Sequence, residues 1–211
     1  IINDPANNLD LRISAAKALG NLGDRASIEP LTAIMNAPAN HAGLRIHVAK
    51  ALGKIGGSSA LQPLTAIMND PVSSPYLRIS AGEALGKIGY TSVVARLIAF
   101  MNAPENGSDL RTSAIRSLGR IGDSSAVEPL TAIMNDPANN SHLRTQAAEA
   151  LGKIGEASGV EALTSIMNDP TNDPYLRISA AEALGKIGDS SAVEHVTDIM
   201  NDPVNHPHLR T

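Results

Sequence analysis

The dipeptide Leu-Arg returns every 33 residues along the chain, and this spacing constrains the fold more than any other feature. Asn, Pro and a pair of Gly residues recur with the same spacing, and no insertion or deletion shifts the register. The chain is therefore a tandem array. We divide it into six 33-residue repeats that start near residues 11, 44, 77, 110, 143 and 176, with partial repeats at 1–10 and 209–211.

The first half of each repeat predicts a helix, as residues 143–155 illustrate (LRTQAAEALGKIG). Apolar residues recur there at helical spacing, and Gly155 is suited to end the helix because glycine tolerates a positive φ. Gly152 lies inside the helix, where it costs about 1 kcal/mol relative to alanine. Its recurrence in every repeat predicts a close backbone contact that a Cβ would block. Helix-capping residues precede the first helices at Asn8, Ser74, Asn140 and Asp173.

The second half of each repeat predicts another helix, as Ser124 to Asn135 illustrate. Ser125 and Glu128 have the spacing of a capping box, and Asn135 suits a left-handed position at the C-terminal end. One apolar stripe is expected to face the core, made of Val127, Leu130, Ile133 and Met134. A single hairpin cannot bury such a stripe, so the pattern predicts an all-α protein, an α-solenoid of stacked helical hairpins.

The recurring pattern LRxxAAxALGKIGDSSAVEPL resembles HEAT-like repeats of the short E-Z, or phycobilin-lyase, type, and it is similar to artificial α-helical repeat scaffolds. The resemblance covers the whole chain, although connectors such as NDPANNSH are longer than is usual for the type. It implies a right-handed superhelix whose second helices line a concave, partner-binding face. Phycobilin lyase subunits, deoxyhypusine hydroxylase and many adaptors share such repeats, so the resemblance leaves the function open.

The composition argues against several classes of protein. The net charge is −4, and the second helices carry Glu29, Gln62, Glu128, Glu161 and Glu194 where a nucleic-acid-binding solenoid would carry basic and aromatic residues, so no nucleic-acid partner is expected. No apolar run is long enough to cross a membrane, and no signal peptide is visible. A cytoplasmic location is favoured on these grounds, but the compartment stays open.

The sequence offers no catalytic residue, metal site or cofactor site, and we expect no enzyme. There is no Cys, which excludes thiolate chemistry. Deoxyhypusine hydroxylase-like proteins carry His-Glu pairs early in the first helices, and no such pair occurs here. The histidines are scattered over different repeats, at His41, His47, His142, His195, His206 and His208. The Asn-rich connectors lack the alternating ligand pattern of a calcium loop.

The Leu-Arg arginines stack once per repeat on one face and allow two interpretations. They could form an anion-binding ladder, or each could pair with a carbonyl or an Asp of a neighbouring connector. We favour the structural pairing, with Asp4, Asp70, Asp136, Asp169 and Asp202 as the acidic candidates. Ala37 and Ala103 replace this Asp in two repeats, which weakens the pairing there.

Residues that break the repeat pattern are the candidates for specificity, because recurrence marks packing. Repeat three departs most: GYTSVVARLIAFMNAP replaces the usual GDSSAVEPLTAIMNDP and introduces Tyr90, Arg96, Ile98 and Phe100. Aromatic and Arg side chains are typical interface anchors, which favours a binding patch. Neutral sequence drift with local repacking of the core is the alternative explanation of these changes. Tyr76 and Tyr175, each just before a first helix, are further candidates for partner contacts.

The leading functional hypothesis is a protein–protein interaction scaffold that binds a partner on the concave second-helix face. An accessory subunit of a phycobilin lyase-like enzyme and an engineered or purely structural array are the alternatives. No polar capping repeat is recognisable at either end. We therefore expect a segment of a longer repeat protein, or end-to-end self-association through uncapped terminal repeats.

Overall fold

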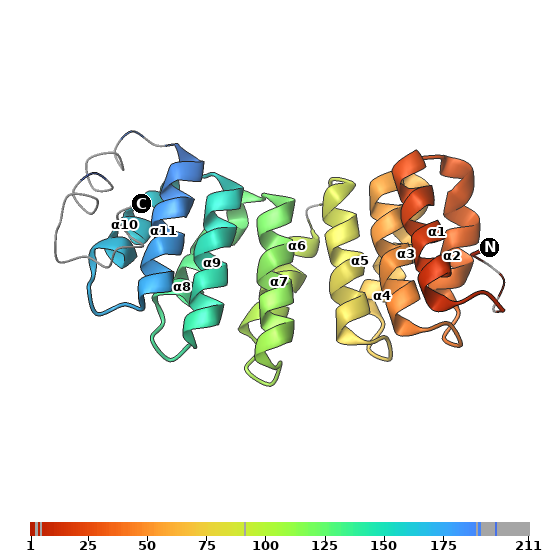
Figure 1. Ribbon diagram of the computed structural model, residues 1–211, viewed down its shortest axis with the longest axis horizontal. Coiled ribbons are helices and arrows are strands. Elements are labelled where there is room, and N and C mark those ends of the chain that lie inside the picture. Colours follow the sequence, from red (N-terminus) through yellow and green to blue (C-terminus); the bar gives the residue numbers. More distant parts are fainter. Residues whose placement is uncertain (3, 5, 91, 189, 191–196, 198–211) are drawn as a thin grey trace. The chain divides into compact units, whose positions relative to one another are not determined.

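The computed structural model describes residues 1–2, 4, 6–90, 92–188, 190 and 197. Within them the chain forms α-helices and short 3-10 turns, and no residue of these ranges lies in a strand (Figure 1). The chain divides into two compact units, Ile1–Leu97 and Ile98–Thr211. The boundary falls inside helix α6 (Val93–Asn102).

The first unit consists of stacked helical hairpins. Its first helices are α1 (Leu9–Leu22), α3 (Ala42–Ile55) and α5 (Pro75–Lys87). Its second helices are α2 (Ile28–Asn36) and α4 (Leu61–Asn69), followed by the beginning of α6. A single 3-10 turn precedes each of α2 and α4, at Arg25–Ser27 and Ser58–Ala60.

The second unit repeats the arrangement. Its first helices are α7 (Ser108–Ile121), α9 (Ser141–Ile154) and α11 (Pro174–Ile187), and its second helices are α8 (Val127–Asn135) and α10 (Val160–Asn168). The 3-10 turns lie at Ser124–Ala126 and Ala157–Gly159. The second helix expected for the sixth repeat, with Glu194 and His195, lies outside the described residues, as do Asp202, His206, His208 and the partial repeat 209–211.

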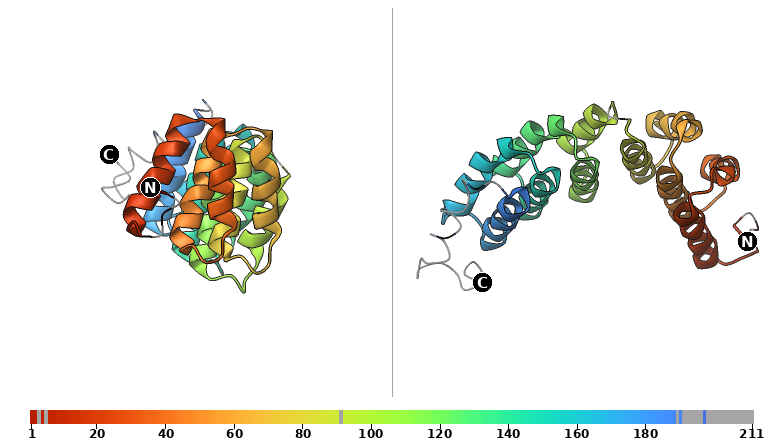
Figure 2. Two further views of the ribbon diagram at one scale, coloured as in Figure 1. Left: turned by 90° about the vertical axis from the view of Figure 1, so that its right-hand side faces the viewer. Right: turned by 90° about the horizontal axis from the view of Figure 1, so that it is seen from above.

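Each unit has two layers, one of first helices and one of second helices (Figure 2). Successive first helices lie side by side, and each second helix packs on the first helix of the following repeat, as α2 does on α3 and α10 on α11. The expected apolar stripe is buried between the layers: Leu130 and Met134 are fully buried in α8, and Leu163 and Met167 in α10. The all-α architecture of stacked hairpins predicted from the 33-residue spacing is confirmed.

The glycine inside the first helix lets neighbouring first helices approach closely. A Cβ built on Gly20 would lie 2.9 Å from the Cα and 3.0 Å from the Cβ of Ala51. The same contact recurs within the units in the pairs Gly53–Ala84, Gly119–Ala150 and Gly152–Ala183. The prediction of a close crossing is therefore confirmed for these pairs, and the packing explains why the helix tolerates the low helix propensity of glycine.

The ends of the helices confirm part of the capping prediction. Asn8, Ser74, Asn140 and Asp173 each accept a backbone N–H bond at the start of a first helix. Gly155 ends α9 with a φ of 79°, as predicted.

Two predictions for the second helices were wrong. Asp123, rather than Ser125, accepts the capping bond at the start of the 3-10 turn, and the α8 N-terminus has no side-chain cap. The turn shifts the α-helical start to Val127, which removes the capping-box geometry. Asn135 is the last helical residue, and the chain leaves α8 through Asp136 in an extended conformation. All positive φ values among the described residues belong to glycine.

Candidate functional site

The arginines of the Leu-Arg dipeptides are structural ties between a connector and its flanking helices. In α9, Arg144 Nε donates to the carbonyl of Met134 at the end of α8, over 2.7 Å. Its Nη2 donates to Asn172 Oδ1 in the next connector, over 2.8 Å. The same pair of bonds holds Arg12 and Arg111, and an Nε–carbonyl bond also anchors Arg45, Arg78 and Arg177. The predicted carbonyl pairing is confirmed, and the side-chain partner of Arg12, Arg111 and Arg144 is Asn instead of the expected Asp.

Where an Asp follows the second helix, its side chain instead stabilises the connector turn. Asp70 accepts from Val72 N over 2.9 Å and from Ser73 Oγ over 2.8 Å. These bonds favour the ionised carboxylate and lower the pKa of Asp70, with a smaller contribution from the charge of Arg78. At Asp169 the Thr171 hydroxyl is the main cause of a lowered pKa. The connectors are therefore internally satisfied turns.

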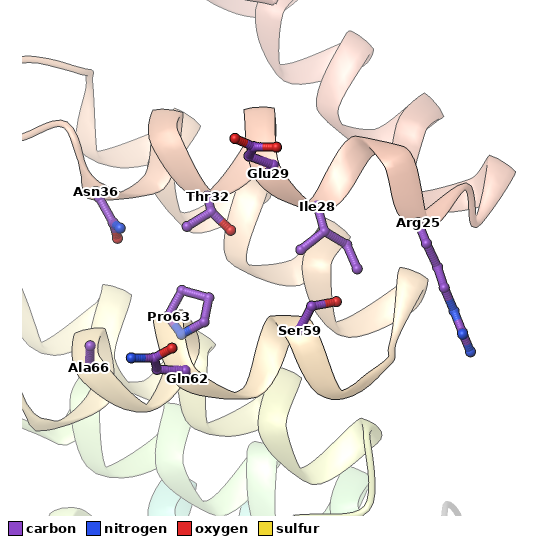
Figure 3. A pocket seen from close by; sticks show the side chains of 9 residues that line it. All are labelled: Arg25, Ile28, Glu29, Thr32, Asn36, Ser59, Gln62, Pro63 and Ala66. Atoms are coloured by element: carbon purple, nitrogen blue, oxygen red, sulfur yellow. The ribbon is translucent and has the colours of Figure 1, made fainter.

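A groove lies between the second helices α2 and α4 of the first unit, and it encloses about 530 Å³ (Figure 3). It is lined from both helices and their 3-10 turns. The lining residues are Arg25, Ile28, Glu29, Thr32, Asn36, Ser59, Gln62, Pro63 and Ala66. The groove arises because the short second helices touch each other over few residues, whereas the first helices pack along their length.

The groove is lined by apolar and polar side chains along its length. Thr32 of α2 lies opposite Pro63 of α4, and Ile28 lies opposite Ser59 nearer to Arg25, while Asn36 and Ala66 lie at the other end (Figure 3). The charged side chains of Arg25 and Glu29 are exposed. Such a surface can take an apolar side chain along its middle and make polar contacts at its rim.

Sequence reasoning missed Arg25, although a signal was present. The other repeats carry Ser58, Thr91, Ser124 and Ala157 at this position. Arg25 is thus the only basic residue in its register among these repeats. The second unit also has Glu161 where the groove has Gln62, so the two second-helix faces differ in charge.

The structure separates the candidates of repeat three. Tyr90 is 41% exposed and Arg96 is exposed, and both belong to the first unit. Ile98 and Phe100 are half-buried and belong to the second unit. The core side of α6 is formed by other residues, Val93, Val94, Leu97 and Met101. The prediction that these four act together in binding stays a prediction.

The two connector tyrosines differ in exposure. Tyr76 is 44% exposed at the start of α5, and Tyr175 is 73% exposed at the start of α11. Both rings are accessible to a partner. They lie in different units and are separate candidates.

The described histidines have local roles. His41 caps α3, where its Nδ1 accepts from Gly43 N over 3.1 Å, and the ring of His47 is bonded to the carbonyl of Gly43. His142 is exposed at the start of α9. In the part of the chain that the structure describes, no three His, Cys, Asp or Glu side chains are grouped so that they could hold a metal ion.

The recurrent hairpin, with its buried apolar stripe and its Gly–Ala crossing, matches a known repeat family. The family described as HEAT repeats matches residues 2–75, 72–141 and 138–208. The chain belongs to the HEAT-repeat family. No curated protein matches it in sequence.

Solved structures share the HEAT-repeat fold. Human deoxyhypusine hydroxylase, in complex with glycerol, is 20% identical with a TM-score of 0.50, and the match covers 99% of this chain and 89% of that one. The complex of CpcE and CpcF of phycocyanin lyase from Nostoc sp. is 24% identical with a TM-score of 0.54, covering 94% and 78%. These likenesses show the fold. Among the described helices, none is long and apolar enough to span a membrane.

Proposed function

We propose that this HEAT-repeat protein is a protein-binding scaffold and that the groove between α2 and α4 receives a segment of its partner. The observation that carries the proposal is the groove itself, where the apolar side chains of Ile28, Pro63 and Ala66 lie among polar ones. The connector arginines and aspartates are engaged in internal hydrogen bonds, which leaves the second-helix face as the more available surface. Short apolar grooves between helices are a common way to hold a peptide or helix.

The groove suggests what the partner segment contains. Apolar side chains of the segment would pack on Ile28 and on Pro63, and an acidic group would lie next to Arg25. The amides of Gln62 and Asn36 can each donate to and accept from a peptide backbone. Affinity for such a small contact is expected in the micromolar range, because few side chains anchor it.

A peptide selection tests the proposal. Peptides are selected from a random displayed library on the wild-type chain, and their affinities are then measured by fluorescence anisotropy. Ala66→Trp fills the groove and is expected to weaken binding at least about tenfold, the equivalent of about 1.4 kcal/mol. Ala33→Trp is the matched control, because Ala33 is exposed on α2 and does not line the groove. Equal affinities for both variants would overturn the groove as the binding site.

The variant Arg96→Ala distinguishes the other candidate surface. Arg96 is exposed on α6 and lies outside the groove. If selected peptides lose affinity with Arg96→Ala and keep it with Ala66→Trp, the binding surface lies on α6, where the departures of repeat three are concentrated. Tyr90→Ser, measured in the same way, shows whether the exposed tyrosine contributes.

An accessory role in a phycobilin lyase-like enzyme has less support. None of the residues lining the groove is aromatic, and the chain has no Cys to which a bilin could be attached. The test is a titration of the chain with a free bilin, followed by absorbance. A saturable shift of the bilin band that Ala66→Trp removes would favour this role over peptide binding.

A further inference from the structure

The groove between α2 and α4 differs in charge from the corresponding positions three repeats later, in and next to α8 and α10. Four positions in and beside the groove carry one positive and one negative charge, and their equivalents in the second unit carry three negative charges. The four positions are Arg25, Glu29, Gly57 and Gln62, and their equivalents are Ser124, Glu128, Glu156 and Glu161. Wherever the two sets differ in charge, the groove is the less negative of the two.

Two of these differences meet at one place. A Cβ built on Gly57 would lie 3.6 Å from Arg25 Nε and 3.9 Å from Arg25 Cζ, so the guanidinium lies beside the backbone of this glycine. The Arg25 side chain is exposed and lines the groove at the end nearer to Ile28 and Ser59 (Figure 3). The glycine therefore takes the place of an acidic neighbour, such as Glu156 in the second unit, exactly where the first unit carries a cation.

The acidic residues closest to Arg25 along the chain do not neutralise it. Asp24 Oδ1 accepts a hydrogen bond from Ala26 N over 2.9 Å and so caps the 3-10 turn. Glu29 follows Arg25 by four residues and also lines the groove. Among the described residues, neither carboxylate lies within ion-pairing distance of the guanidinium. The positive charge of Arg25 is therefore available to a partner.

A carboxylate matches this end of the groove better than a phosphate group does. The guanidinium can donate two parallel N–H bonds to one carboxylate, and the hydroxyl of Ser59, at the same end, can donate another (Figure 3). A phosphorylated side chain carries nearly two negative charges at neutral pH, and the carboxylate of Glu29 would repel it more strongly than it repels a single charge.

We infer that the groove selects a partner segment with an Asp or Glu side chain, which binds Arg25, and that the charge of the corresponding α8 and α10 positions excludes the same segment. The inference rests on the proposed function and goes beyond it, because it names the residue that determines specificity and assigns the segment to one of two similar second-helix surfaces. The charge complementarity at Arg25, Gly57 and Gln62 carries it.

The test measures how strongly the protein prefers a carboxylate to an amide. Peptides selected on wild type from a random displayed library are expected to be enriched in Asp or Glu. Each is compared by fluorescence anisotropy with a copy in which the acid is changed to its amide, and wild type should prefer the acid about threefold to tenfold. Arg25→Ser, the residue type of Ser124, should reduce this preference to less than about twofold. Lys17→Ser removes the same charge from an exposed position outside the groove and should keep the preference.

A second variant adds charge instead of removing it. Gln62→Glu introduces the residue type of Glu161 at an exposed position, and it should weaken binding of the acidic peptide about threefold while the amide copy binds as before. Thermal melts establish that each variant is folded.

The outcomes separate this inference from the proposed function. Peptides that lose affinity with Ala66→Trp but carry no acid, or that keep their acid preference with Arg25→Ser, would overturn the inference and leave the groove as the binding site. Tighter binding of a phosphoserine copy than of the acid would overturn the assignment of a carboxylate. A library that yields no peptide sensitive to Ala66→Trp would overturn the proposed function and this inference together.

Discussion

Gly152 of α9 and Ala183 of α11 form a backbone contact that leaves no room for a side chain. A Cβ on Gly152 would lie 2.6 Å from the Cα of Ala183 and 2.8 Å from its Cβ. Both atoms belong to or adjoin the backbone of a packed helix, so neither can rotate away. The contact sets how closely successive first helices approach.

Gly152→Ala is expected to destabilise the protein. The alanine gains about 1 kcal/mol of helix propensity, but overpacking against Ala183 costs about 1–3 kcal/mol, and the two helices must separate to admit the methyl group. We expect a net loss of about 1–2 kcal/mol, since separation also exposes the apolar stripe. The measurement is urea denaturation followed by far-ultraviolet circular dichroism.

Gly185→Ala is the matched control in the same register. No described atom lies within 4 Å of the added Cβ, so only the gain in helix propensity remains. We expect an increase in stability of up to about 1 kcal/mol in the same urea denaturation. If both substitutions changed the midpoint in the same direction, the close crossing would not be the reason for the recurrent glycine.

The recurrence of residues was a good guide to this packing. A residue that costs helix stability and still recurs at Gly20, Gly53, Gly119 and Gly152 must be retained by contacts, so the crossing was predictable without knowing its partner. Recurrence was a weaker guide to local hydrogen bonds. Asp123 and Ser125 can both cap a helix, and the choice depends on the 3-10 turn, which no apolar periodicity marks.

Arg144→Lys is expected to destabilise the second unit. The arginine donates through Nε to Met134 O and through Nη2 to Asn172 Oδ1, and these bonds tie a helix end to two connectors. A lysine ammonium carries its donors on one atom and cannot reach both acceptors in this geometry. We expect a loss of about 1–2 kcal/mol in the free energy of unfolding, because the bonds are charge-assisted and partly buried.

The control for this substitution is Arg25→Lys. Arg25 is exposed and lines the groove, and a conservative change there is expected to alter the stability by less than about 0.5 kcal/mol. If Arg144→Lys and Arg25→Lys lowered the free energy of unfolding by similar amounts, the two hydrogen bonds of Arg144 would contribute little to stability.

The candidate site was less predictable than the fold. The groove depends on the spacing between α2 and α4, which is a property of packing and has no pattern along the chain. Arg25 could have been found as a departure from its register, since the equivalent positions are small or hydroxylated. Tyr90 and Arg96 were found as departures from the repeat pattern, and both are exposed. Phe100 was found in the same way but is half-buried. A departure from the pattern does not reveal which face of a helix carries the changed residue.

The turn aspartates are expected to make stability fall in acid. Hydrogen bonds lower the pKa of Asp70, Asp123 and Asp169 in the folded protein, mainly from Val72 N, the Ser125 hydroxyl and the Thr171 hydroxyl respectively. Since the folded pKa is below the unfolded one, the stabilisation is present above the unfolded value of about 3.9 and is lost as the pH falls through the folded value.

Thermal melts between about pH 5 and about pH 2 measure this effect. The melting temperature is expected to fall with decreasing pH, and the fall should be shallower in Asp123→Asn, which removes a carboxylate whose pKa is lowered. Glu105→Gln, at an exposed position in a connector, serves as the control and should leave the slope unchanged. A slope unaffected by Asp123→Asn would mean that the bond from Ser125 does not favour the ionised carboxylate in the folded protein.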